Sequence, residues 1–146
     1  MNASKGIDPR GPRVGASITA VLLAAVVLLG ASTAGLWLLT FIMLSFLLGT
    51  IRGAEGSWQG LLYKRFVRPR LSPPTEMEDR RPPRFAQGVG LFVTGVGVIL
   101  GFFGVLPAVP IAAAAAFVAA ALNAVVGLCL GCELYLLLRR SGLVRA

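Results

Sequence analysis

Two long uncharged stretches constrain this chain more than any other feature. No charged residue occurs between Val14 and Ile51, and none occurs between Phe85 and Cys132. Because about 20 apolar residues cross the hydrocarbon core of a bilayer, each stretch is long enough for two spans. Only 14% of the residues are charged, too few to cover the surface of a soluble domain of this length. The chain is therefore predicted to be a small polytopic membrane protein.

The expected fold is all-α, with four transmembrane helices arranged as two hairpins in a single membrane domain over residues 1–146. The spans are expected at about residues 16–30, 34–51, 87–105 and 110–132, with residues 52–86 as the central loop. A cleaved signal peptide is the competing interpretation of the first span. The apolar pattern resumes directly after it, which favours an uncleaved helix. No internal repeat is strong enough to predict, although the two hairpins are similar in plan.

The positive charges predict the orientation of the spans. All fourteen Lys and Arg residues, which give a net charge of +8, lie in the N-terminal tail, the central loop or the C-terminus. The hairpin tips, around Gly30–Gly35 and Pro107–Pro110, carry no charge. With four spans the three basic segments share one side, and the positive-inside rule makes that side cytoplasmic. Anionic lipid head groups are the expected partners of this basic face, and nucleic acid is not.

The central loop divides into two parts. The first, SWQGLLYKRFVRPR, places Trp58, Leu61, Leu62 and Phe66 at helical spacing with basic residues among them. This pattern predicts a short amphipathic helix in the cytoplasmic interface, with its aromatic face in lipid. The second part, LSPPTEMEDRRPPRF, holds four prolines and is predicted to be an extended connector, because proline interrupts helices.

Small residues predict how the last two spans pack. Glycines share one face of the third span, and a stripe of alanine and glycine lines the fourth. Small residues at this spacing let membrane helices approach closely. The expected contact sets Gly97, Gly101 and Gly104 against Ala116, Ala120, Ala124 and Gly127.

The only two cysteines, Cys129 and Cys132, form a Cys-x-x-Cys motif near the cytoplasmic end of the fourth span. A permanent structural disulfide is not expected, because the cytoplasm keeps thiols reduced. One cysteine pair without any histidine predicts no metal site in a single chain, and no cofactor is predicted. Such a pair can exchange disulfides or carry a sulfane sulfur as a persulfide, since one thiol attacks and its neighbour resolves. Packing of two small apolar side chains is an equal alternative.

The position of the motif within its helix affects this chemistry. Late in a helix, the macrodipole disfavours a thiolate. A fourth span continuing to Arg140 is longer than one crossing needs, so a break at Gly127 or Gly131 is expected, and a break would weaken that objection. In a reactive pair, Cys132 is expected to attack because it lies nearer the aqueous boundary, and Cys129 to resolve. Glu133 either pairs with Arg140, the favoured role, or handles protons.

Three segments of the sequence resemble one family. IDPRGPRVGA, RPRLSPPTEMEDRRPPRFAQGVG and NAVVGLCLGCELYLLLRR together are similar to a bacterial, actinobacterial-type integral membrane family catalogued as domain of unknown function 4395. The resemblance implies a four-span protein of the bacterial plasma membrane. It also implies a Cys-x-Gly-Cys-x-x-Tyr signature on Cys129, Gly131, Cys132 and Tyr135. Relatives tend to be encoded near thioredoxin-like or thiosulfate sulfurtransferase proteins, which implies a partner of that kind by association.

Two function classes follow. One is a cytoplasmic-face thiol–disulfide or persulfide relay, with Cys129 and Cys132 as its thiols and Glu133 as a proton or ion-pair partner; this class leaves open whether the chain is itself an enzyme. The other is a non-catalytic membrane scaffold or small-solute conduit subunit, alone or as a homo-oligomer, in which the cysteines only pack. A relay needs the pair to be reachable from the cytoplasm, whereas a packing role buries it.

Overall fold

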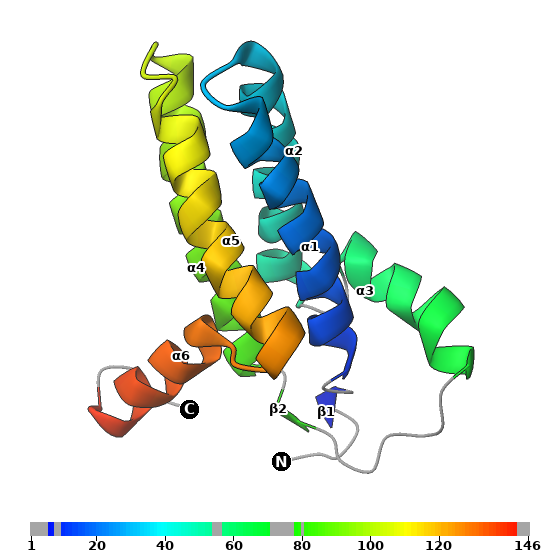
Figure 1. Ribbon diagram of the computed structural model, residues 1–146. Coiled ribbons are helices and arrows are strands. Elements are labelled where there is room, and N and C mark those ends of the chain that lie inside the picture. The colour runs from blue at the N-terminus through cyan, green and yellow to red at the C-terminus, as the bar shows by residue number, and fades with distance from the viewer. Residues whose placement is uncertain (1–5, 8–9, 54–56, 71–77, 80, 143–146) are drawn as a thin grey trace.

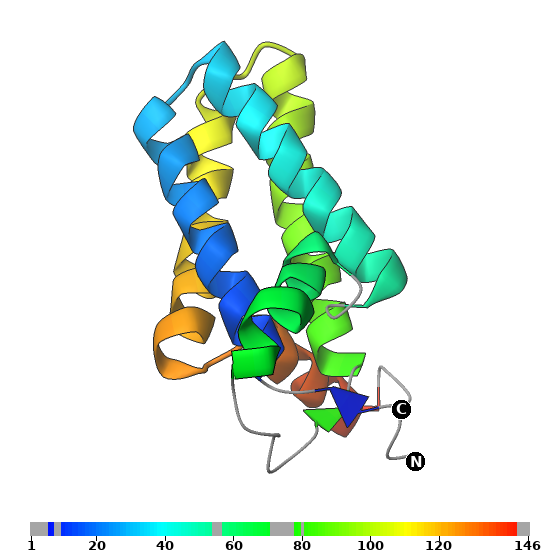
Figure 2. The same cartoon turned by 90° about the vertical axis from the view of Figure 1, so that its right-hand side faces the viewer.

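Four long helices form the body of the molecule. The computed structural model describes residues 6–7, 10–53, 57–70, 78–79 and 81–142. The long helices are α1 (Arg10–Leu29), α2 (Thr33–Arg52), α4 (Arg81–Phe102) and α5 (Ala108–Val126). They run side by side as two hairpins whose short connections lie at the same end (Figures 1 and 2). All four are long and apolar enough to cross a membrane, so the predicted all-α fold with four membrane-spanning helices is confirmed.

The buried core lies where the four helices meet. α1 packs most extensively against α5, and α2 against α4. The core is made of aliphatic side chains and alanines: Leu23, Val26, Leu36, Leu39, Ile42, Val98, Val109, Ala113 and Ala116. The outward faces are apolar as well, with large exposed side chains such as Val21, Phe92 and Ile111. Soluble proteins rarely expose so much apolar surface, whereas lipid covers such faces in a membrane protein.

Two of the predicted glycines bring α4 close to its neighbours. A Cβ on Gly97 would lie 2.5 Å from Ala112 Cβ, and a Cβ on Gly101 would lie 2.7 Å from Leu36 Cδ1. The prediction that these glycines face residues 116–127 is wrong. In an antiparallel hairpin the end of α4 meets the beginning of α5. Gly104 lies in the connecting turn with a φ of +95°, and no neighbouring atom lies within 4 Å of the position that its Cβ would take.

Three helix boundaries differ from the predicted ones by six residues each. α1 begins at Arg10 rather than at about residue 16, with Pro12 in its first turn. α4 begins at Arg81, six residues before its expected start. Pro82 and Pro83 lie in its first turn, where a helix needs no backbone N–H donor. The prediction of an extended connector is therefore wrong from Arg81 onward, and residues 71–77 lie outside the described residues. α5 ends at Val126 rather than at residue 132.

Smaller elements gather at the end of the bundle opposite the hairpin tips (Figure 1). α3 (Trp58–Leu62) continues as the π-turn η3 (Tyr63–Val67) and the 3-10 turn η4 (Arg68–Arg70). α6 (Leu130–Arg140) follows α5. Strands β1 (Gly6–Ile7) and β2 (Glu78–Asp79) pair antiparallel, with Ile7 opposite Glu78. α3 and α6 project to opposite sides of the bundle, and the strand pair lies between them.

The predicted helix in the central loop is present as α3 and its continuation, but its tryptophan points inward. Trp58 Nε1 donates a hydrogen bond to Ser45 Oγ of α2 at 2.7 Å. Leu61, Leu62 and Phe66 are the exposed apolar side chains of this segment. The segment therefore keeps an apolar outer face, whereas its indole is part of the helix packing.

Candidate functional site: the cysteine turn at the start of α6

The two cysteines lie in the turn that joins α5 to α6. Gly127, directly after α5, has a φ of +74°, a left-handed conformation that glycine adopts without steric cost. Cys129 is the N-cap residue of α6, and Cys132 lies in the first turn of that helix. Of the two positions expected for a break, Gly127 and Gly131, the structure has it at Gly127, and Gly131 lies within α6. The motif therefore stands at the beginning of a helix and not at the end of one.

The sulfur of Cys129 caps α6. Cys129 Sγ accepts a hydrogen bond from the backbone N–H of Cys132 at 3.2 Å, the bond that a serine or aspartate side chain makes at other N-caps. This N–H group and the positive end of the α6 macrodipole both stabilise negative charge on that sulfur. The unfavourable macrodipole expected from the sequence does not apply to this geometry.

Cys129 and Cys132 are joined by a disulfide, with their Cα atoms 5.1 Å apart. This Cα separation is in the usual range for disulfides. The sequence predicts no structural disulfide, because the cytoplasmic side of a membrane is reducing. In the structure, the turn at Gly127 frees Cys129 from the helix and turns it toward Cys132. Both cysteines are half-buried, so the bond is partly accessible from the surface.

The geometry also changes the expected order of the two thiols. The prediction that Cys132 attacks assumes that Cys129 lies one turn deeper in the fourth span. In the structure Cys129 precedes α6, and its sulfur receives the backbone hydrogen bond. Negative charge is therefore best stabilised on Cys129.

Arg13, from the first turn of α1, closes the end of α5 beside this turn. Its Nη2 donates to the carbonyl oxygens of Ala124 and Val125, each at 3.3 Å. The backbone N–H groups of Gly127 and Leu128 donate to the carbonyl oxygens of Asn123 and Leu122, respectively. Carbonyls that the last turn of a helix leaves without partners are thus satisfied. The guanidinium also offsets the negative end of α5. In the sequence, Arg13 is one of the basic residues of the N-terminal tail that predict orientation, and its contact with α5 is not predicted from them.

Gly131, between the cysteines, lets α6 approach α4. A Cβ on Gly131 would lie 2.5 Å from Ala86 Cβ, so any larger residue would push the helices apart. One turn further on, the buried ring of Tyr135 packs against Phe85 of α4, with ring centroids 5.5 Å apart. The Cys-x-Gly-Cys-x-x-Tyr signature thus has two parts. Its cysteines form the turn, and its glycine and tyrosine dock the helix that carries them.

Glu133 is exposed in the first turn of α6, whereas Arg139 and Arg140 lie in the last turn. Arg140 lies seven positions after Glu133, about 10 Å along the helix axis. Within the described part of the chain the favoured ion pair between them does not form. A carboxylate at a helix N-terminus is electrostatically favourable, and this one stands beside Cys132 in the chain.

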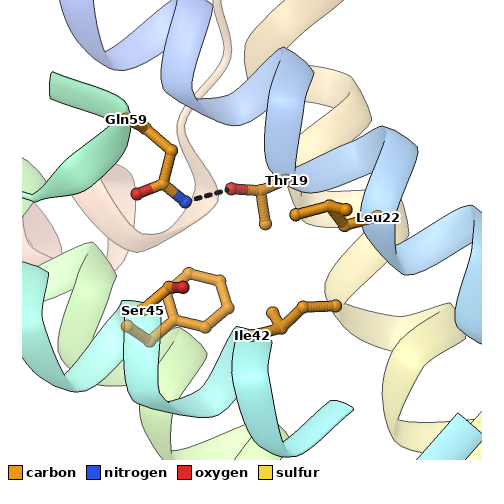
Figure 3. Close-up of a pocket in the computed structure, with 6 residues that line it drawn as sticks. Thr19, Leu22, Ile42, Ser45 and Gln59 are labelled. Carbon is orange, nitrogen blue, oxygen red and sulfur yellow. Dashed lines mark hydrogen bonds between the residues drawn. The ribbon is translucent and has the colours of Figure 1, made fainter. Parts of the chain in front are cut away.

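A second polar cluster lies between α1, α2 and α3 (Figure 3). It surrounds a small pocket lined by Thr19, Leu22, Ile42, Ser45, Phe46 and Gln59. Gln59 Nε2 donates to Thr19 Oγ1 at 3.2 Å, as Figure 3 shows. The pocket is too narrow for a water molecule. Its hydrogen bonds fasten α3 to the bundle and leave no room for a ligand.

Four apolar helices with a cysteine turn at one end define a multi-pass membrane protein whose one candidate reactive group, among the described residues, is a disulfide-forming pair. Residues 7–140 match the family model Domain of unknown function (DUF4395), and the chain belongs to this family. The family resemblance noted in the sequence is thereby confirmed. Searches of curated proteins and of solved structures found no match to the chain.

Proposed function

We propose that the chain is a thiol–disulfide or persulfide relay at the cytoplasmic face of a bacterial plasma membrane. One observation carries the proposal: Cys129 and Cys132 form a disulfide across the N-cap turn of α6. A pair in such a turn can open and close while the spanning helices stay in place. The same turn stabilises the thiolate that disulfide exchange requires.

The distribution of charge supports a cytoplasmic site. The end of the bundle that holds α3 and α6 is also where α1 and α4 begin and α2 ends. By these element bounds it carries the following basic residues: Arg13, Arg52, Lys64, Arg65, Arg84, Arg139 and Arg140. The hairpin connections at residues 30–32 and 103–107 carry none. Under the positive-inside rule the cysteine turn and both termini face the cytoplasm. Anionic head groups then contact the basic rim.

The exchange proceeds in two steps. The Cys129 thiolate attacks one sulfur of a partner disulfide, so that a mixed disulfide forms and the other partner sulfur leaves as a thiolate. Cys132 then loses its proton, for which Glu133 is the adjacent base in the chain, and attacks Cys129 Sγ. The internal disulfide closes and the second partner thiolate is released. Two thiols of this chain are oxidised, and one partner disulfide is reduced to two thiols. The same two steps in reverse reduce the disulfide of this chain again.

A sulfane sulfur donor suits the same two thiols. When the Cys129 thiolate attacks the outer sulfur of thiosulfate, a persulfide forms on Cys129 and sulfite leaves. Attack by Cys132 on Cys129 Sγ then closes the disulfide and releases hydrosulfide. The partners of such a relay are a thioredoxin-like protein, which has its own cysteine pair, or a thiosulfate sulfurtransferase.

Single-cysteine variants in cells test this function. Cys132→Ser keeps the attacking thiol and lacks the resolving one, so it accumulates a mixed disulfide or a persulfide on Cys129. Cys129→Ser accumulates neither. Cells grown with thiosulfate or exposed to an oxidant are quenched in acid, and adducts are measured by intact-protein mass spectrometry, with the double serine variant as control. Adducts on Cys129→Ser alone would assign the attack to Cys132. Adducts on neither variant would leave the non-catalytic scaffold or conduit as the function.

A further inference from the structure

A short sequence motif occurs twice, at the start of each hairpin. IDPRGPR occupies residues 7–13 and EDRRPPR occupies residues 78–84, 71 positions later. The two share the pattern Asp-x-Arg-x-Pro-Arg. In both copies the first arginine of the pattern begins a long helix, Arg10 for α1 and Arg81 for α4. A shared pattern of four residues would mean little alone, but the structure gives both copies the same contacts.

The last arginine of each copy bonds the end of a helix from the other hairpin. Arg13 donates to two consecutive carbonyls of α5, those of residues 124 and 125. Arg84 donates to two consecutive carbonyls of α2, those of residues 50 and 51, at 2.7 Å each. Two residues beyond each carbonyl pair stands a glycine with positive φ, Gly127 at +74° and Gly53 at +85°. Both helix ends thus combine an arginine of the other hairpin with a positive-φ glycine. The two glycines differ in ψ, which is 13° at Gly127 and 162° at Gly53, so only Gly127 is in the left-handed helical conformation.

The short helices that follow are equivalent too. Ser57 is the N-cap of α3 and accepts the N–H of Gly60 at 3.2 Å, as Cys129 caps α6 and accepts the N–H of Cys132 at 3.2 Å. A tyrosine stands six residues after each cap. Both are buried, and they are the only two tyrosines of the chain.

Each of these tyrosines lies against the start of the first long helix of its own hairpin. Tyr135 packs on Phe85, near the start of α4. A Cβ on Gly11, in the first turn of α1, would lie 3.2 Å from Tyr63 Cδ1. A second contact occurs in both copies. Gly131 of α6 is close to Ala86 of α4, and Gln59 of α3, the counterpart of Gly131, is close to Gly15 of α1, the counterpart of Ala86.

The strand pair joins the two copies at equivalent positions. β1 and β2 run antiparallel, and Ile7 lies opposite Glu78, its counterpart 71 residues later. A two-fold axis produces such self-equivalent pairing. The same axis would carry α3 to the position of α6 on the opposite side of the bundle (Figure 1). Parallel repeats related by an axis along the membrane normal are known in other membrane proteins.

We infer that the chain consists of two copies of one strand–hairpin–helix unit, residues 7–67 and 78–140, related by a pseudo-two-fold axis along the long helices. The turn Ser57–Gly60 is the counterpart of the cysteine turn and has the same capping geometry without sulfur. The copies have diverged in how they hold this turn. α3 is fastened by hydrogen bonds from Trp58 and Gln59, whereas α6 docks through Gly131 and Tyr135. This inference holds whether or not the native pair is reactive.

Moving the cysteines to the counterpart turn tests the equivalence. The full chain carries Cys129→Ser and Cys132→Ser together with Ser57→Cys and Gly60→Cys. After mild oxidation and alkylation, intact mass should show the new pair closed to the same extent as the native pair in the parent. The matched control places cysteines at the same spacing inside α6, as Leu134→Cys and Leu137→Cys in the same background, and should keep two alkylated thiols. A transplanted pair that stays open like the control would overturn the inference.

The reverse exchange covers the case in which the transplanted variant does not fold. Cys129→Ser combined with Cys132→Gly gives α6 the cap of α3. This variant should have the same apparent Tm in detergent as the reduced parent, because a Ser-x-x-Gly turn already serves at the equivalent position. Loss of the folded protein in gel filtration, or a clear fall in Tm, would contradict the equivalence of the two turns.

Discussion

Replacing Gly131 with alanine tests how the cysteine helix is held. The added Cβ would lie 2.5 Å from Ala86 Cβ and 2.6 Å from Ala86 Cα. Carbon atoms in contact lie about 3.5–4.0 Å apart, so α6 must move from α4 by roughly 1 Å. Overpacking of this kind costs about 1–3 kcal/mol. The movement also weakens the Tyr135–Phe85 pair, which contributes about 0.5–1.5 kcal/mol, whereas the better helix propensity of alanine returns at most about 1 kcal/mol.

The expected net loss for Gly131→Ala is about 1–3 kcal/mol, or a fall in apparent Tm of roughly 3–10 °C for a chain of this size. Thermal unfolding of the purified protein in detergent measures it. The matched control is Gly95→Ala, because the nearest atom to its Cβ would be Met43 Sδ at an ordinary 3.9 Å. The control should melt at or above the parent temperature. If Gly131→Ala melts as high as Gly95→Ala, the close contact between α6 and α4 does not exist.

Further substitutions test other contacts by the same methods. Gly101→Leu would drive a side chain into Leu36 and Val109, and we expect a larger fall in Tm than for Gly131→Ala. Stability equal to that of the parent would refute the close approach of α4 to α2 and α5 at Gly101. Arg84→Gln removes both 2.7 Å bonds to the end of α2 and should cost about 1–2 kcal/mol, with only partial recovery in Arg84→Lys, which lacks the planar fork. Gly127→Ala forces alanine to a φ of +74°, which costs about 1–2 kcal/mol. This variant should also reoxidise its cysteine pair more slowly than the parent, as measured by intact-protein mass spectrometry of alkylated samples. Lys64→Cys in a chain without native cysteines should react with an impermeant reagent only after cells are permeabilised; labelling of intact cells would contradict the proposed orientation.

The four spans could be predicted from sequence because they depend on composition alone. A long run of predominantly apolar residues favours the bilayer whatever its neighbours are. A break in the fourth span was also predictable, since a span that continued to Arg140 would be too long. The sequence left Gly127 and Gly131 as equal candidates for it, because either glycine can end a helix. These features require no knowledge of contacts between distant residues.

The start of α4 was missed for a local reason. Proline is expected to break a helix, but Pro82 and Pro83 lose nothing in a first turn, where the backbone N–H groups have no helical partner. The same two prolines are compatible with the start of a helix and with a break in one. The sequence alone does not show whether the helix lies after them or ends before them.

The cysteine turn was only partly predictable, because its chemistry depends on the residue at which α5 ends. With the break placed at Gly127, Cys129 becomes the cap of α6, and the expected order of the two thiols changes. Arg13 was missed because it contacts carbonyls more than 110 residues away in the chain. The repeated Asp-x-Arg-x-Pro-Arg pattern was the available signal in the sequence, and the structure shows that both copies make the same contact.

The most direct test of a relay is the redox state of Cys129 and Cys132 in living cells. Cells expressing the full chain are acid-quenched during normal growth and again after brief exposure to a thiol oxidant, and free thiols are alkylated before intact mass is measured. We predict that a substantial fraction of the pair is reduced during growth, becomes disulfide after the oxidant and returns to the reduced state as the cells recover. A pair that stays fully in the disulfide state, or fully in the reduced state, through all three stages would contradict a relay and identify the cysteines as structural.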